Sequence, residues 1–108
     1  MNKYASEITG NLDIFIAQNE DDCDGEIIKS REVLIHGDAE GLKSFATLLI
    51  KLADTNQNDI LGLPIGAREH VHLRPKHDLS NSSDAVIFGR LDAKGTGAFY
   101  DRFIPRKK

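Results

Sequence analysis

The sequence predicts an α+β fold, in which one main helix packs on one face of a mostly antiparallel sheet of four or five strands. One segment has clear helical periodicity, and several short segments are rich in β-branched and aromatic residues. Helices and strands do not alternate often enough for a doubly wound parallel sheet. A chain of 108 residues has the size of one two-layer domain. We expect a single domain over residues 1–108, with residues 1–10 and 105–108 frayed.

The N-terminal part is expected to contribute two strands separated by an acidic loop. Residues 12–17 (LDIFIA) are short, apolar and partly β-branched, which predicts a strand. Residues 18–26 (QNEDDCDGE) are polar and rich in turn-forming residues, which predicts a loop. A second strand could start at Ile27, and residues 32–36 (EVLIH) predict a strand more strongly.

Residues 39–54 carry the strongest pattern in the chain. Asp38 precedes them and fits a helix N-cap, because its carboxylate can accept the free amides of the first turn. At a helical spacing, the apolar side chains fall within one arc of roughly 160°. They are Leu42, Phe45, Ala46, Leu49, Ile50, Leu52 and Ala53. Leu48 lies at the border of this arc. We therefore predict a surface helix in which Leu49 is fully buried against the sheet.

The C-terminal half is expected to add two or three strands. Residues 55–68 contain glycine, proline and asparagine and predict a loop. Residues 69–74 (EHVHLR) alternate and predict a half-buried strand that Pro75 ends. Residues 84–92 predict a further strand, and residues 98–104 predict a last strand or a short helix.

Composition restricts the class of protein. Fourteen basic and 17 acidic residues give a net charge of −3, which argues against a general nucleic-acid binder. The single cysteine, Cys23, excludes an internal disulfide and fits a reducing compartment. The N-terminus lacks the apolar core of a signal peptide, and no apolar run approaches the roughly 20 residues of a membrane span. We therefore expect a cytoplasmic protein with no membrane partner.

Clustered carboxylates between residues 20 and 26 form the first candidate site. A calcium loop of the EF-hand type would start at Glu20 and place Asp22, Asp24 and Gly25 correctly. Its last position, which requires a bidentate glutamate, is Arg31 instead. Calcium binding is therefore disfavoured, and two interpretations remain: a solvated turn, or an anionic surface for a basic partner. The candidate partner-binding residues are Glu20, Asp21, Asp22 and Asp24.

Two histidines and a following arginine form the second candidate site. Alternation along a strand places His70 and His72 on one face, with Arg74 beside them. Two histidines are half a zinc site, and His36, His77 or Cys23 would have to complete it. Open-face polar residues or a partner contact are the alternatives. We expect both imidazoles to be accessible, and we expect no cofactor and no structural metal.

No catalytic motif is complete. Asp22 and Asp24 flank Cys23, and their negative charge would suppress the thiolate that a cysteine nucleophile requires. The sequence contains no Walker-type phosphate-binding loop and no nucleophile elbow. Arg90, Asp92 and Lys94 stand near the end of a predicted strand, where charged residues are more often part of a rim than catalytic. We therefore expect a binding protein that is not an enzyme.

Several short motifs together resemble a known family. They are the strand end Ile35-His36-Gly37-Asp38, the helix that begins Glu40-Gly41-Leu42, the segment His70-Val71-His72-Leu73, and Ser82-Ser83 before Val86-Ile87-Phe88-Gly89. This set resembles the small immunity proteins of bacterial polymorphic toxin systems, of the type numbered thirty-two, over residues 32–92. The resemblance implies a non-enzymatic inhibitor that binds and neutralises a cognate toxin domain. It does not distinguish structural from toxin-contacting histidines.

A second function therefore stays open beside toxin neutralisation. It is a small metal- or ligand-binding domain that uses the face around His70 and His72. The sequence leaves the toxin's activity, the interface and the oligomeric state undetermined.

Overall fold

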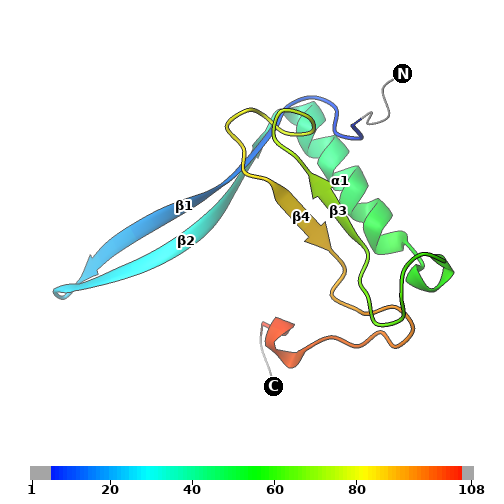
Figure 1. The fold of residues 1–108 in the computed structure, drawn as a ribbon. Coiled ribbons are helices and arrows are strands. Elements are labelled where there is room, and N and C mark those ends of the chain that lie inside the picture. Colours follow the sequence, from blue (N-terminus) through cyan, green and yellow to red (C-terminus); the bar gives the residue numbers. More distant parts are fainter. Residues whose placement is uncertain (1–5, 106–108) are drawn as a thin grey trace. The chain divides into compact units, whose positions relative to one another are not determined.

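A computed structural model describes residues 6–105, and its elements follow one another as β1, β2, α1, β3 and β4 (Figure 1). Their bounds are Leu12–Cys23, Glu26–Gly37, Ala39–Asp54, His70–Leu73 and Val86–Gly89. Short 3-10 helices cover Gln57–Asp59 and Asp101–Phe103. The predicted fraying of residues 1–5 and 106–108 lies outside the described residues. None of the helices in the described part is long and apolar enough to cross a membrane.

The α+β class is confirmed, but the prediction of one four- or five-stranded sheet is wrong. The strands form two separate two-stranded antiparallel sheets, β1 with β2 and β3 with β4. Residues 80–84 run beside the outer edge of β1 without becoming a strand there. They contact β1 partly through side chains: the Ser83 hydroxyl accepts a hydrogen bond from the Ile14 amide, and the Asp84 carboxylate accepts one from the Ile16 amide. A hydrogen bond to a side chain occupies a backbone group at the edge of β1 without continuing the backbone ladder. The sheet therefore ends at β1.

The predicted acidic loop over residues 18–26 is also wrong, because these residues belong to a long hairpin. β1 and β2 have 12 residues each and pair without a bulge from Leu12 opposite Gly37 to Cys23 opposite Glu26. Only Asp24 and Gly25 remain as the turn, with φ of 52° and 85°. Positive φ at both central residues defines the turn that matches the twist of a hairpin, and Asp-Gly favours it. Ile27 and Ile28 therefore continue one strand with residues 32–36.

The helix prediction is confirmed in its bounds and its cap. α1 covers Ala39–Asp54, and the Asp38 carboxylate accepts the Gly41 amide at 2.7 Å. The predicted burial of Leu49 is wrong, since 41% of this residue is exposed, whereas Leu48 and Leu52 are 5% and 8% exposed. The helix thus buries the border of the predicted arc instead of its centre.

The chain divides into two compact units, each with its own small core. The first comprises the chain up to Thr47 together with Leu73–Val86, and the second comprises Leu48–His72 together with the chain from Ile87. The first core contains Ile8, Leu12, Ile14, Leu73 and Leu79. The second contains Leu48, Leu52 and Ala93. Small cores of this kind leave many apolar side chains in contact with water.

Candidate binding surfaces

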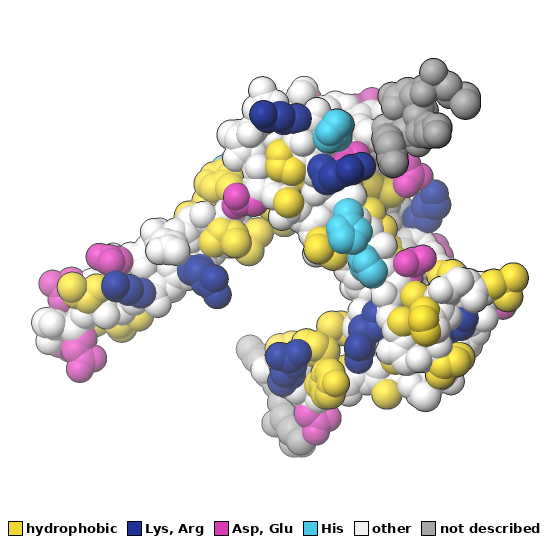
Figure 2. Space-filling model, in the orientation of Figure 1, with side chains coloured by type: hydrophobic (Ala, Val, Ile, Leu, Met, Phe, Trp, Pro, Cys, Tyr) yellow, Lys and Arg dark blue, Asp and Glu magenta, His cyan; other side chains and the backbone are white. Residues whose placement is uncertain are grey.

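The outer half of the β1–β2 hairpin carries the predicted acidic residues. Glu20, Asp21 and Asp22 lie on β1 and Asp24 lies in the turn, and all four are exposed. Alternation separates them, because Glu20 and Asp22 point to one face of the ribbon and Asp21 to the other. Acidic side chains gather at the free end of the hairpin in the space-filling view (Figure 2). The structure thus brings the four residues to one end of the hairpin but not to one face.

Two basic residues lie on β2 next to this acidic end. Lys29 lies opposite Glu20, and its Nζ is 3.8 Å from the carboxylate, with both side chains largely exposed. Arg31 lies opposite Gln18 and has no ion pair within the described part of the chain. A shallow hollow of about 300 Å³ lies between the strands and is lined by Gln18, Asn19, Glu20, Lys29, Ser30 and Arg31. Arg31 is therefore a cation of the hairpin that is available to a partner.

Apolar side chains on the same hairpin are unusually exposed. Ile27, Ile28 and Val33 expose 65%, 50% and 64% of their surface, and Ile16 and Ile35 expose 52% and 46%. Single exposed apolar residues are ordinary, but neighbouring ones on one element are typical of an interaction surface. The hairpin thus combines apolar, basic and acidic side chains that the rest of its unit does not cover.

Three serines hold the base of the hairpin in place, and no role was predicted for them from the sequence. Ser80 and Ser82 donate hydrogen bonds to the Asp13 carboxylate, the latter at 2.7 Å. These bonds, together with the positive potential of His36, lower the pKa of Asp13 below its usual value. Ser83 is buried and donates to the Ile14 carbonyl at 2.8 Å. Its burial against the backbone indicates that Ser83 is structural.

His70 and His72 lie together on β3, and both are exposed, as predicted. Their ring centroids are 4.9 Å apart at an interplanar angle of 64°, and Nδ1 of His70 is 3.1 Å from the Arg68 carbonyl oxygen. Arg74 is exposed beyond the end of the strand, and its backbone amide donates to Asp78. Within residues 6–105, no group of three or more His, Cys, Asp or Glu could hold a metal ion. The structure therefore gives no support to the alternative metal site.

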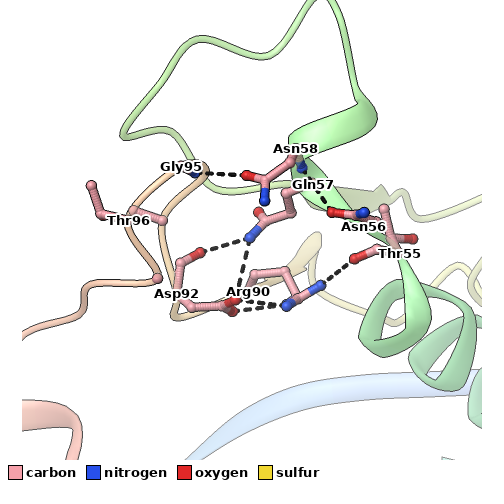
Figure 3. A pocket seen from close by; sticks show the side chains of 10 residues that line it. Thr55, Asn56, Gln57, Asn58, Arg90, Asp92, Gly95 and Thr96 are labelled. Carbon is pink, nitrogen blue, oxygen red and sulfur yellow. Dashed lines mark hydrogen bonds and ion pairs between the residues drawn. The ribbon is translucent and has the colours of Figure 1, made fainter.

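A polar pocket of about 330 Å³ lies in the second unit (Figure 3). The guanidinium of Arg90 donates to the Asp92 carboxylate at 2.6 and 2.8 Å, and also to the Leu52 and Thr55 carbonyls. The bond from Arg90 lowers the pKa of Asp92 below its usual value. Buried Gln57 donates to the Asp92 carbonyl at 2.9 Å and accepts from the Glu69 amide at 2.8 Å. Because these groups are bonded to one another, they hold the second unit together.

Lys94, which was predicted to lie on a rim, is instead a structural cation. It is only 8% exposed, and its Nζ donates to the carbonyls of Ile60 and Leu63, the latter at 2.6 Å. Backbone carbonyls satisfy a buried ammonium group, which otherwise has a large cost of desolvation. These bonds hold the loop around Leu61 in place, although Leu61 itself is 97% exposed. The sequence contains no signal for this role of Lys94, because its partners are backbone carbonyls, which every residue carries.

Comparison with known proteins identifies one related family. The family model described as Immunity protein 32 matches residues 32–91, which is more than half of the chain. The matched region begins on β2 and ends just beyond β4, so it leaves out the acidic end of the hairpin. No curated protein and no solved structure matches the chain.

Proposed function

Because the chain belongs to the Immunity protein 32 family, we propose that it binds a cognate bacterial toxin domain and neutralises it without catalysis. The family match over residues 32–91 is the observation that carries this proposal. The exposed hairpin supports it, because one element offers a partner apolar, acidic and basic groups at once. The alternative is a small metal- or ligand-binding domain that uses the face around His70 and His72, and within residues 6–105 no cluster of three or more metal ligands supports its metal-binding form.

Within this function, the acidic end of the hairpin attracts a basic toxin surface. Glu20, Asp21, Asp22 and Asp24 are solvated, so they act mainly on the rate of encounter and on its salt dependence. His70 and His72 on β3, and Arg74 beyond it, are the further proposed toxin contacts, since all three are exposed. Their pairing with the toxin would need no metal and no cofactor.

The test begins with a search of the genes beside this protein's gene for a toxin domain, which is then made as a catalytically inactive variant. We expect stoichiometric binding of the intact protein to this domain and rescue of cells that express the active toxin. A protein that neither binds nor rescues would contradict the proposed function. Calorimetry and growth assays measure the two outcomes independently.

The same assay tests the acidic end. A quadruple alanine variant of Glu20, Asp21, Asp22 and Asp24 should fold, associate more slowly and lose most of the salt dependence of association, because rim charges act on encounter. Stopped-flow mixing at two ionic strengths measures this. The control variant, Glu40→Ala with Asp54→Ala, removes two exposed carboxylates of α1 instead. Equal association rates for the quadruple variant and the intact protein would remove the acidic end from the interface.

A further inference from the structure

We propose that the outward edge of β2 is the docking edge of this protein, and that an edge strand of the toxin adds to it. The inference rests on the proposed function and names the surface and the chemistry of the partner. It depends on which backbone groups of the hairpin are already bonded, on which side chains flank them, and on where the charges lie.

Hydrogen bonds at the base of the hairpin reveal which backbone groups face outward. The carbonyls of Leu12 and Ile14 accept from the amides of Ser80 and Asp84, so the even-numbered residues of β1 point away from β2. In an antiparallel pair, alternate residues bond across the ladder and the others face the free edges. Because Leu12 pairs with Gly37 and Ile14 with Ile35, the outward residues of β2 are odd-numbered. They are Ile27, Lys29, Arg31, Val33 and Ile35.

This β2 edge is long and open. No backbone hydrogen bond from another described segment reaches these five residues. Natural proteins usually protect such edges with short strands, prolines, bulges or charged side chains, and of these devices the β2 edge has only the charges of Lys29 and Arg31. β2 has 12 residues, no proline and a continuous register. The edge of β1, by contrast, is occupied along its base by residues 80–84.

Three of the five side chains along this edge are apolar and uncovered. Ile27, Val33 and Ile35 are each about half exposed or more, at 65%, 64% and 46%. A strand added to the edge would cover these side chains with its own and would satisfy the free amides and carbonyls. Both gains come from one docking event, which is why an added strand fits this edge better than a flat surface contact.

The charges select the partner. If two copies of β2 paired about Arg31, Arg31 would face Arg31, and a shift by one pair toward the turn would place Lys29 against Arg31. Only the opposite shift, which places Arg31 against Val33, avoids like charges. Like charges directly opposite each other are destabilising across strands. Lys29 already has Glu20 beside it, whereas Arg31 has no carboxylate on its rung. The fitting occupant is therefore a toxin strand with apolar residues and a carboxylate opposite Arg31.

Hydrogen exchange on the intact protein, with and without the inactive toxin domain, tests the pairing directly. Toxin binding should slow exchange at the amides of Ile27, Lys29, Arg31, Val33 and Ile35. The outward amides of β1 beyond its occupied base, at Gln18, Glu20 and Asp22, should stay unchanged. This readout needs no substitution. If the toxin binds and none of the β2 amides is protected, the inference is wrong while the proposed function stands.

Substitutions provide a matched second test. Arg31→Pro removes an outward amide without removing a bond to β1, and it should weaken toxin binding by about ten-fold or more, because it leaves a partner carbonyl unpaired. Gln18→Pro makes the same change on the opposite strand of the same rung and should leave affinity unchanged. Arg31→Gln separates the lost charge from the lost amide and should have a smaller effect than Arg31→Pro.

Several results would overturn the inference. The first is that Arg31→Pro and Gln18→Pro, both shown by circular dichroism to be folded, bind the toxin with equal affinity. A stable dimer of the intact protein that Arg31→Pro dissociates is another, because it would assign the edge to a second copy. If the intact protein fails to bind the toxin at all, the proposed function itself is contradicted.

Discussion

Gly41 illustrates how a single residue joins the helix to the hairpin. A Cβ atom at this position would lie 2.0 Å from the Asn11 carbonyl oxygen, closer than any real contact. Asn11 in turn donates two hydrogen bonds to the Asp38 carboxylate, at 3.0 and 2.7 Å. The carboxylate that begins α1 therefore also holds the residue that precedes β1, and only glycine leaves room for this approach.

Gly41→Ala should destabilise the protein although alanine is the better helix former. The clash costs about 1–3 kcal/mol, against about 1 kcal/mol gained in helix propensity. Gly62→Ala is the control, because nothing lies within 4 Å of its added Cβ. Denaturant midpoints measure both changes. A Gly41→Ala protein more stable than the intact one would contradict the contact.

Residues differ in how far their roles can be predicted from sequence. Asp38 was predictable, because an N-cap acts on amides that follow it within three residues. Ser83 and Lys94 were not, since their partners are carbonyls at Ile14 and at Ile60 and Leu63, far away in the sequence. Backbone atoms carry no residue signature, so such bonds are visible only after folding.

The helix shows the same limit at the scale of an element. Its bounds followed from periodicity and its cap, but the buried stripe runs through Gly41, Leu48 and Leu52, not through Leu49. The prediction assumed that the widest apolar arc faces the core. Gly41 instead fixes the rotation of the first turn through its contact with Asn11.

Leu48→Ala and Leu49→Ala distinguish the two orientations. Leu48→Ala should cost about 2–5 kcal/mol, as expected for truncation of a buried leucine. Leu49→Ala should cost much less, since 41% of Leu49 is already exposed. Urea unfolding of both variants gives the comparison. Equal losses of stability would restore the predicted orientation.

The hairpin was mispredicted although its signal was present. Polar residues over 18–26 resemble a loop, because a strand is ordinarily recognised by a buried apolar face. A solvated ribbon has no such face beyond its base. Asp24-Gly25 between two candidate strands was the alternative signal, and it marks a two-residue turn. The acidic residues could thus be recognised in the sequence, but their place on a hairpin and their division between its two faces required the structure.

At the scale of the whole molecule, each compact unit depends on a hydrogen-bonded carboxylate. Asp38 and Asp13 hold the base of the hairpin in the first unit, and Asp92 holds Arg90 in the second. Hydrogen bonds to the charged form lower the pKa of all three, from Asn11 for Asp38, from Ser80 for Asp13 and from Arg90 for Asp92. Both units therefore respond to acid in the same direction.

Acidification below about pH 4 should lower the thermal midpoint of the intact protein, because an unperturbed aspartate has a pKa of about 3.9. A carboxyl whose folded pKa is lower than its unfolded pKa stabilises the fold above the unfolded value, and this contribution is lost as pH falls through the folded value. Asp38→Asn should reduce the acid slope, because the variant has no such proton to take up. Asp54→Asn removes an exposed carboxylate at the end of α1 and is the control for the lost charge. An unchanged slope in Asp38→Asn would show that this carboxylate does not link folding to pH, and the capping contacts would then act through geometry alone.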